Sequence, residues 1–304
     1  MLDDRSLKKI KEISSKYKSK VYFDHSLKSH TTIMVGGSAL LWHEPVSLEE
    51  LREMREFLEH TGIAVFVIGN GSNVLIPDEG VNRAVVSLSN KNFRGVSSCG
   101  LKLTAGAGAK LSEIISYCSE NSLSGFEGMV GIPATLGGAL RINASHKCAI
   151  SDYLESVKLL LKNGKVESVG KKDIKFGYRY SSIDKGAVIV EAVFSLGKDR
   201  PAVIKERARE YFTEKLAKQP LEKNTLGCVF KNFSDGKRSS GELIDKAGLK
   251  GAAFGDAYVS EKHANFIVNR KCANAKDVIN LIKHVREKVE EKFAVKLETE
   301  IEII

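Results

Sequence analysis

The sequence has no apolar run long enough to cross a membrane, and residues 1–20, MLDDRSLKKIKEISSKYKSK, carry charge from the third position onward. A membrane-spanning helix needs about 20 consecutive apolar residues. A secretory signal needs an uncharged apolar core near the N-terminus. We therefore expect neither membrane insertion nor secretion, and we expect a cytoplasmic protein.

Cysteine is scarce, and its pattern excludes two classes of site. The five cysteines are Cys99, Cys118, Cys148, Cys228 and Cys272. Their number is odd and no C-x-x-C occurs, so we expect neither a disulfide framework nor a metal site. Most of these thiols, Cys118 among them, are expected to be small buried hydrophobes. Cys228 lies in TLGCVFKN (225–232), and the residues alone leave open whether it fills the core, acts as a nucleophile or donates a proton.

Two common nucleotide-binding motifs are absent. The stretches GNGSNV (69–74) and GAGAKL (106–111) do not complete G-x-G-x-x-G, and no glycine-rich loop ends in the Gly-Lys-Ser/Thr of a P-loop. Glycine is nevertheless concentrated at 35–39, 69–75 and 125–144, beside predicted strands. Backbone N–H groups approach an anion closely where no Cβ intervenes. The three loops favour phosphate or pyrophosphate binding on a fold other than the Rossmann fold.

The formal charge of +9 is compatible with nucleic acid, a membrane surface or an anionic small molecule as partner. The lysines are scattered, and no RNA-binding signature is present. An anionic substrate explains the charge equally well, and we expect no nucleic-acid partner.

Helix and strand patterns alternate without an internal repeat, which predicts a mixed α+β protein. Residues 1–20 fit an amphipathic helical extension, and a second helix starts at Ser47, with Glu50 placed to complete a capping box. Pro201 suits the first position of a new helix. A later long helix is predicted to begin after Asn274. We predict domains over 1–20, 21–198 and 199–304.

Eight segments then occur in a specific order: VGGSA, VIGNGSNVLI, GMVGIPATLGGALRINA, FGYRYS, LGCVFKN, SSGELIDKAGLKG, VSEKHANFIVN and LETEIEII. Together they resemble the UDP-N-acetylenolpyruvoylglucosamine reductase (MurB) family, in its shorter type II form, over residues 30–304. The resemblance implies a two-subdomain FAD-binding region of the vanillyl-alcohol-oxidase (PCMH) type over 21–198, with a break near 85–95. It also implies a C-terminal α+β substrate domain over 199–304.

The resemblance implies a reaction as well. NADPH, as co-substrate, reduces FAD, and flavin N5 gives a hydride to the enolpyruvyl ether of UDP-N-acetylenolpyruvoylglucosamine. The product, UDP-N-acetylmuramate, is used in peptidoglycan synthesis. Hydride at the methylene carbon creates enolate-like charge, which needs fixed positive or hydrogen-bonding groups. The adjacent carbon then needs a proton from a positioned acid.

Three residues match the family's catalytic positions. Arg179 would hold the substrate carboxylate and enolate oxygen through its planar fork; the alternative is a surface arginine, although Phe176, Tyr178 and Tyr180 favour burial. Glu300 would help hold the enol and assist protonation, but in its alternating segment it could merely face water. Cys228 matches the proton donor, which is serine or cysteine in the family. A free thiol has a pKa of about 8.5, so it is a stronger acid than an alcohol.

The resemblance also implies binding residues. The expected substrate contacts are Tyr178, Lys218, Asn232 and Ser240, although Lys218 could equally be a solvated helix end. The expected FAD contacts are Val35, Gly36, Gly37, Gly69, Asn70, Gly71, Ser72, Asn73, Ile132, Pro133, Gly137 and Gly138. Residues 145–148 depart from the family, which usually has glycine and an aromatic residue there.

Three alternatives remain from other classes. His263 and Asn265 together with Cys228 suggest a Cys-His-Asn hydrolase, in which the flavin loops would have no purpose. A second alternative is another flavin oxidase of the same superfamily, with FAD attached covalently. A third is a basic binding protein without enzymatic activity. The sequence does not predict an oligomeric state.

Overall fold

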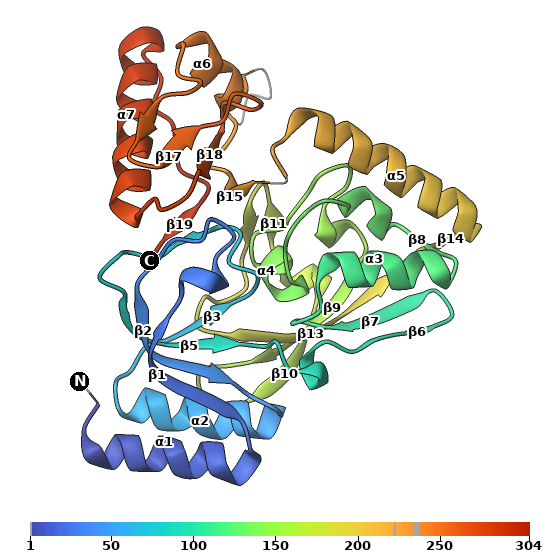
Figure 1. The fold of residues 1–304 in the computed structure, drawn as a ribbon. Coiled ribbons are helices and arrows are strands. Elements are labelled where there is room, and N and C mark those ends of the chain that lie inside the picture. Colours follow the sequence, from blue (N-terminus) through green and yellow to red (C-terminus); the bar gives the residue numbers. More distant parts are fainter. Residues whose placement is uncertain (1, 222, 234–237) are drawn as a thin grey trace. The chain divides into compact units, whose positions relative to one another are not determined.

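The computed structural model describes residues 2–221, 223–233 and 238–304. These residues form two compact units (Figure 1). Unit one contains the chain up to His25, Ala39–Gly69 and Asn82–Thr213; unit two contains Ser26–Ser38, Asn70–Val81 and Glu214–Ile304. Two segments from the first third of the chain therefore belong with the C-terminal residues. The domain boundaries at 20/21 and 198/199 stay predictions about the linear chain.

Unit one begins with a four-stranded sheet in the order β1-β2-β5-β3, in which β3 and β5 pair in parallel. Helices α1 and α2 pack against it through one buried apolar cluster, which includes Ile10, Met54 and Ala84 (Figure 1). The predicted N-terminal helix is thus confirmed, and it is part of a core. The elements are α1 (Asp4–Tyr17), α2 (Leu48–His60), β1 (Lys20–Ser26), β2 (Ser38–Glu44), β3 (Val65–Ile68) and β5 (Val81–Ser87).

The predicted capping box at the start of α2 is half formed. The Ser47 hydroxyl accepts from the Glu50 amide at 3.2 Å, as predicted. The Glu50 carboxylate, however, accepts from the Val46 amide at 2.7 Å and contacts His43 Nε2 at 2.8 Å. Both His43 and Glu50 are fully buried, so the carboxylate turns toward the polar partner in the core.

A second sheet of unit one has the order β10-β9-β13-β7-β6 and is antiparallel throughout. Its largest apolar cluster also takes in residues of α3 and α4. Cys118 is 1% exposed in this cluster, and burial raises the pKa of its thiol to about 12, which confirms its predicted core position. The prediction that most of the thiols are buried is wrong, because Cys99 and Cys272 are exposed and Cys148 and Cys228 are half-buried. The elements are α3 (Leu111–Glu120), α4 (Leu136–Arg141), β6 (Val96–Cys99), β7 (Lys102–Gly106), β9 (Leu154–Leu160), β10 (Val166–Gly170) and β13 (Val188–Ser195).

One long helix and several short elements complete unit one. Helix α5 (Pro201–Lys218) begins at Pro201, as predicted, and extends past Thr213, where the division between the units falls. The remaining elements are the hairpin β11 (Phe176–Gly177) and β12 (Tyr180–Ser181), the pair β8 (Leu123–Ser124) and β14 (Gly197–Lys198), and the 3-10 turns η2 (Lys91–Phe93), η3 (Phe126–Met129), η4 (Ile150–Asp152) and η5 (Lys171–Asp173).

Unit two is built on an antiparallel sheet in the order β15-β18-β17-β16. Helix α7 begins after Asn274, whose side chain accepts from the Asp277 amide, so the predicted N-cap is confirmed. The elements are β15 (Asn224–Cys228), β16 (Ala253–Phe254), β17 (Ala257–Val259), β18 (Phe266–Asn269), α6 (Ser240–Lys246), α7 (Ala275–Phe293), η1 (Lys28–His30) and the parallel pair β4 (Val74–Leu75) and β19 (Glu302–Ile303).

Segments Ser26–Ser38 and Asn70–Val81 pack against the C-terminal part of unit two and form hydrogen bonds with it. Ile33 and Leu75 share an apolar cluster with residues of α7. The Asp78 carboxylate accepts from the amides of Ala275 and Lys276, at 2.7 and 3.0 Å. An anionic side chain at a helix N-terminus satisfies amides that have no partner within the helix.

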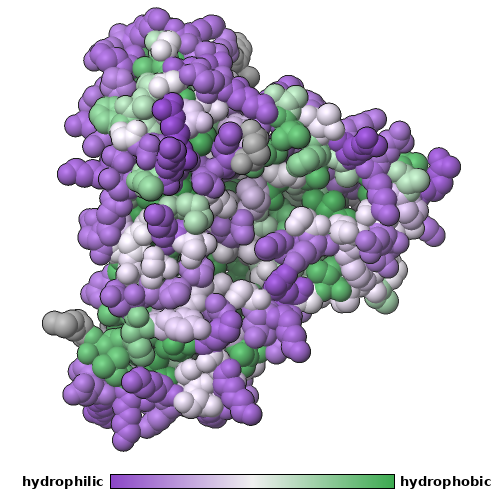
Figure 2. Space-filling model, in the orientation of Figure 1, coloured by the Kyte–Doolittle hydropathy of each residue, from purple (hydrophilic) through white to green (hydrophobic). Residues whose placement is uncertain are grey.

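Hydrophilic side chains cover most of the molecular face seen in Figure 2. Among the described residues, no helix combines the length and the apolar character needed to cross a membrane.

Candidate active site

Arg179 lies in unit one, at the second position of the two-residue turn between β11 and β12. Its φ of 54° is in the left-handed region, which few residues other than glycine adopt. Its Nη1 donates to Ser145 Oγ at 3.1 Å, and its guanidinium carbon lies 5.3 Å from the Tyr178 ring centroid. The turn therefore presents a cation held on one side by a hydroxyl and flanked by an aromatic ring.

The expected burial of Arg179 is observed in part: its Nε is buried, but two of its aromatic neighbours face solvent. Tyr178 and Tyr180 are 52% and 54% exposed, and Arg179 is half-buried. Tyr178 lies in the two-residue turn of the hairpin and Tyr180 directly follows this turn, so both rings lie at the tip of the hairpin. Tyr178 is therefore accessible, as a substrate contact would need to be.

Four of the expected FAD contacts lie just before α4 or in its first turn. Pro133 and Gly138 are exposed, and Ile132 and Gly137 are half-buried. The Gly137 amide donates to the Ala107 carbonyl at 2.8 Å, so this amide is already used within the protein. A Cβ at Gly138 would come no closer than 3.5 Å to its nearest neighbour, the Thr135 hydroxyl. The surface at Gly138 is therefore open to a ligand.

Gly36 and Gly37 are required by close packing within the protein, whether or not they contact a ligand. A Cβ at Gly37 would lie 2.2 Å from the Asp78 carbonyl oxygen, and one at Gly36 would lie 2.9 Å from the Ile76 side chain. The buried Thr31 hydroxyl fixes the start of this loop by donating to the Val35 carbonyl at 2.8 Å and accepting from the Val35 amide at 3.2 Å. These glycines are required by the packing of unit two itself.

The loop between β3 and β4 has the geometry expected of an anion-binding loop. Gly71 has a φ of 60°, and a Cβ there would lie 2.1 Å from the His30 carbonyl oxygen. Within the described part of the chain, the amides of Gly71, Ser72 and Asn73 have no hydrogen-bond acceptor. Consecutive amides of this kind form concavities that bind phosphate groups. The loop therefore fits the pyrophosphate of a dinucleotide such as FAD.

Cys228 ends β15 immediately after a β-bulge. Thr225 pairs with Val268 and Cys228 with Phe266, so three steps on β15 face two steps on β18. Gly227, in the bulge, has a φ of 76°. A bulge bends its strand and changes the direction of a side chain. The half-buried thiol is thereby turned out of the regular alternation of the strand.

Glu300 lies next to the Cys228 segment in unit two. The Glu300 amide donates to the Val229 carbonyl at 2.8 Å, and the Glu300 carbonyl accepts from Asn73 Nδ2 at 3.2 Å. Glu298 and Glu302 are exposed, whereas Glu300 is half-buried. The structure thus brings the segments of two predicted catalytic residues together and distinguishes Glu300 from its solvent-facing neighbours.

Asn265 holds the residues that follow Cys228. Its Oδ1 accepts from the Phe230 amide at 2.9 Å, and its Nδ2 donates to the Phe230 carbonyl at 2.8 Å. His263 Nδ1 accepts from the Asn265 backbone amide at 3.2 Å. Since the Asn265 side chain is engaged with Phe230, it does not orient His263 as the hydrolase alternative requires.

The remaining predicted substrate residues lie at two places in unit two. Asn232 is exposed and accepts from the Ser240 amide at 3.1 Å, while the fully buried Ser240 hydroxyl donates to the Lys231 carbonyl. Lys218 is exposed at the end of α5 and pairs with Glu214 at 3.0 Å. The substrate contacts of these three residues stay predictions, and for Ser240 the observed bonds indicate a role in joining the start of α6 to residues 231 and 232.

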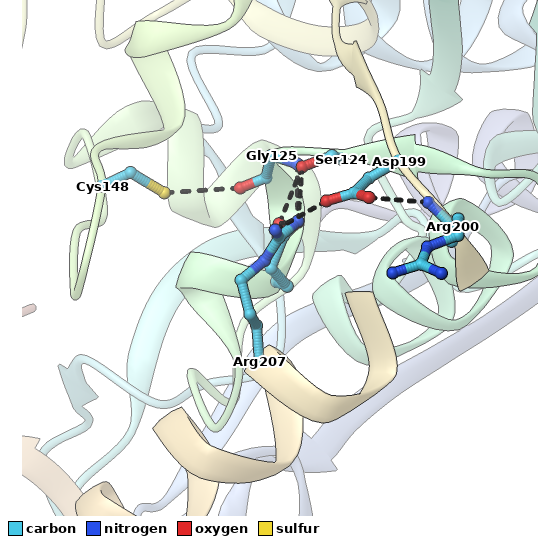
Figure 3. A network of polar contacts seen from close by, with 7 residues as sticks. Ser124, Gly125, Cys148, Asp199, Arg200 and Arg207 are labelled. Carbon is cyan, nitrogen blue, oxygen red and sulfur yellow. Dashed lines mark hydrogen bonds and ion pairs between the residues drawn. The ribbon is translucent and has the colours of Figure 1, made fainter. Parts of the chain in front are cut away.

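A polar network in unit one has no counterpart in the predictions. Arg207 on α5 donates to the Ser124 hydroxyl at 2.8 Å and to Asp199 at 2.7 Å (Figure 3). It also donates to the Glu127 carboxylate at 2.7 Å. The other Glu127 oxygen accepts from the Gly125 amide at 2.6 Å. The network fixes the start of the glycine-rich segment 125–144. Its members are up to 83 residues apart in sequence, so no local pattern signals it.

Neither a small-molecule pocket elsewhere in unit one nor a metal site is supported by the described residues. A hollow of about 220 Å³ in unit one is lined by residues that include Ser47, Asn92 and Lys158, but by none of the predicted site residues. This volume is below that of usual small-molecule pockets. No group of three or more His, Cys, Asp or Glu side chains in the described ranges could hold a metal ion.

Two known protein domains match this chain. The family model of an FAD binding domain matches residues 39–170, which include strands β6, β7, β9 and β10 of the second sheet but not β13. The profile of the C-terminal domain of UDP-N-acetylenolpyruvoylglucosamine reductase matches residues 219–304. The chain is thus an FAD-binding protein of the α+β class, with a PCMH-type domain followed by a second domain, as predicted.

The particular family follows from full-length relatives. The chain is 38% identical over 298 residues to UDP-N-acetylenolpyruvoylglucosamine reductase of Caldanaerobacter subterraneus subsp. tengcongensis, covering 97% of each chain. It is 36% identical to that of Listeria innocua, covering 93% of this chain and 95% of the relative. The crystal structure of the enzyme from Thermus caldophilus matches with a TM-score of 0.80 at 34% identity, covering 94% and 98%. The chain belongs to the UDP-N-acetylenolpyruvoylglucosamine reductase family, which confirms the predicted resemblance.

Proposed function

We propose that this protein reduces UDP-N-acetylenolpyruvoylglucosamine to UDP-N-acetylmuramate for peptidoglycan synthesis, with bound FAD and with NADPH as electron donor. Family membership supports the activity. The observation that carries the mechanism is the hydrogen bond between Glu300 and Val229, which places a carboxylate-bearing residue beside the segment of a re-directed thiol.

The bond changes of the reaction define what the chain must supply. FAD, when bound, supplies the hydride that the methylene carbon receives, and this carbon becomes a methyl group. The electron pair of the double bond moves toward the carboxylate, and the ether-bearing carbon then takes a proton. We assign this proton to the Cys228 thiol, because the half-buried side chain is re-directed by the bulge at Gly227.

Charge stabilisation is assigned to Arg179, and help with holding and protonating the enol is assigned to Glu300. A guanidinium binds a carboxylate through two parallel hydrogen bonds and stabilises negative charge that develops beside it. Glu300 would hold the enol oxygen and assist proton transfer from Cys228. Tyr178, Lys218 and Asn232 are assigned to substrate binding, with Lys218 as a cation for the diphosphate. Ser240, whose amide donates to Asn232 Oδ1, would position Asn232.

The cofactor is assigned to two sets of residues. The amides of Gly71, Ser72 and Asn73 would hold the pyrophosphate of FAD, with Asn70 and Gly69 at the start of the same loop. The surface around Gly138, with Ile132, Pro133 and Gly137, would contact FAD as well. Residues 35–37 would complete the set, and their glycines also satisfy the packing of the loop.

A single spectroscopic experiment tests the proposal. The purified protein should show flavin absorption that leaves with the small molecules on denaturation. Anaerobic NADPH should bleach it, and UDP-N-acetylenolpyruvoylglucosamine should restore it with formation of UDP-N-acetylmuramate. Flavin that stays attached to the denatured chain would instead support a covalent flavin oxidase. A colourless protein that ignores added FAD would support a binding protein.

A further inference from the structure

We propose that Ser145 is a positioning residue, whose hydroxyl orients the Arg179 guanidinium for the substrate carboxylate. This inference rests on the proposed function. The Ser145 Oγ accepts from Arg179 Nη1 at 3.1 Å, and both side chains are half-buried in unit one. A guanidinium has five N–H donors in a rigid fork, so a bond to one nitrogen restricts the orientations of the group while other donors can serve a carboxylate.

The position of Arg179 in the hairpin explains why the bond to Ser145 matters. Its backbone occupies a two-residue turn in the left-handed conformation, at the tip of a hairpin whose strands are two residues long. A long side chain on such a turn loses considerable rotamer entropy when it binds a ligand. The Tyr178 ring flanks the guanidinium, and Ser145 supplies the directional bond.

The segment before Ser145 is fastened to the same hairpin at alternate positions. The Arg141 carbonyl accepts from the Ser181 hydroxyl at 2.9 Å, and Asn143 Nδ2 donates to the Gly177 carbonyl at 3.0 Å. Ser145 is the next residue in this alternation. Residues 141, 143 and 145 thus contact both strands and the turn of the hairpin, which fixes Ser145 relative to Arg179.

The segment after Ser145 is anchored independently. Ser145 and Ala149 form an antiparallel bridge, and the His146 amide donates to the Cys148 carbonyl at 3.1 Å. The Lys147 amide donates to the Gly128 carbonyl at 3.0 Å, and the Cys148 thiol donates to the Gly125 carbonyl at 3.6 Å (Figure 3). Residues 145–148 are those that depart from the family pattern, and this tight turn makes Ser145 a rigid acceptor.

The test compares Ser145→Ala and Ser145→Thr with wild type. Ser145→Ala should lower kcat/KM for the enolpyruvyl sugar nucleotide by about tenfold, mostly through KM, because one hydrogen bond to a charged group is lost. The rate of flavin reduction by NADPH in the absence of sugar nucleotide should stay unchanged. Ser145→Thr, which keeps the hydroxyl, should stay within about twofold of wild type.

Two further variants separate positioning from a general structural effect. Ser116→Ala, which removes an exposed hydroxyl bonded to Glu120, should leave every rate unchanged. In an Arg179→Lys background, Ser145→Ala should add less than about a twofold loss, because Ser145 acts through Arg179. Full wild-type kinetics of Ser145→Ala, or an undiminished tenfold loss in the lysine background, would overturn the inference. A wild-type protein that does not reduce the sugar nucleotide would instead overturn the proposed function, and this inference with it.

Discussion

The backbone amide of Glu300 donates to the carbonyl of Val229 across 2.8 Å, which joins the C-terminal segment to the residue after Cys228. Val229 in turn donates its amide to the Asn265 carbonyl at 2.9 Å. The proposed acid and the proposed carboxylate are therefore carried by neighbouring backbone segments of one compact unit, in which sheet pairing limits their relative movement.

Substitution of Cys228 tests the proton donor. Cys228→Ala should lower kcat for the enolpyruvyl substrate by about 10²–10⁴-fold, because general acid catalysis contributes an amount of this order. NADPH should still reduce the flavin, which separates loss of the acid from loss of the cofactor. In wild type, kcat should fall at alkaline pH, because a thiolate has no proton to donate.

Cys228→Ser supplies the matched control. It should retain part of the activity, and its alkaline decline should move to higher pH because an alcohol ionises less readily than a thiol. The measurement is a kcat–pH profile of both forms. A Cys228→Ala enzyme that turns over at the wild-type rate would remove Cys228 from the mechanism.

Glu300 can be compared with Glu298 in the same segment. Glu300→Gln should lower kcat by at least about tenfold, because the amide keeps the size but loses the charge and the proton affinity of the carboxylate. Glu298→Gln should have no effect, because the side chain is 73% exposed and its pair with Lys231 lies at the surface. Equal kinetics of the two variants would indicate that Glu300 merely faces solvent.

Two glycine substitutions separate cofactor contact from packing. Gly138→Ala should not lower the thermal stability of the apoprotein, because the new methyl group meets no atom closer than 3.5 Å and alanine is favoured over glycine within a helix. If FAD contacts this surface, the same substitution should weaken FAD binding by about tenfold through steric overlap. Gly37→Ala should destabilise the apoprotein itself by at least about 2 kcal/mol, because its Cβ would overlap the Asp78 carbonyl. Fluorescence titration with FAD and thermal unfolding give the two readouts, and unaltered FAD affinity of Gly138→Ala would remove Gly138 from the cofactor site.

The sequence predicts elements well where the signal is local. Helix caps at Ser47 and Asn274, the helix start at Pro201 and the burial of Cys118 all depend on residues within one or two turns. The family resemblance adds the fold class and the cofactor, because ordered motifs report on the whole chain. The roles of the predicted site residues, in contrast, stay predictions.

Long-range polar contacts could not be predicted. Glu50 turns to His43 and Val46 because the core offers them as partners, which overrides the local capping pattern. The tyrosines beside Arg179 are exposed because both lie at the tip of the hairpin. Ser145 and Asn265 acquire their contacts only when segments 34 and 35 residues away are brought beside them.

The Asn265 side chain is expected to stabilise the segment that follows β15, because it forms two hydrogen bonds with Phe230. Asn265→Asp keeps the shape but places a carboxylate against the Phe230 carbonyl in a site that is 2% exposed. The free energy of unfolding should fall by about 2–4 kcal/mol, since a buried acceptor loses its donor and a charge is buried. Asn163→Asp in an exposed turn should change it by less than about 0.5 kcal/mol. Thermal unfolding of both variants provides the comparison, and similar melting temperatures would contradict the assignment.

The Glu127–Arg207 pair should make unit one sensitive to acid. Burial raises the pKa of the Glu127 carboxyl, but hydrogen bonds from the Gly125 amide, Ser124 and Arg207 outweigh this and hold the pKa below its ordinary value. The folded-state pKa is therefore lower than that of the unfolded chain, about 4.3. The ionised carboxylate stabilises the fold above that pH, and this contribution is lost as the pH falls through the lower, folded-state pKa.

Glu127→Gln and Arg207→Gln measure this contribution. At pH 7 each should lower the free energy of unfolding by about 1–3 kcal/mol, less than for a fully buried pair because Arg207 is 31% exposed. Between about pH 5 and pH 3 wild type should lose stability more steeply than Glu127→Gln, which has no carboxylate to protonate. Glu155→Gln, which removes the exposed pair with Lys102, should follow the wild-type curve. The readout is chemical unfolding at several pH values, and equal slopes for wild type and Glu127→Gln would show that this carboxylate does not control acid stability.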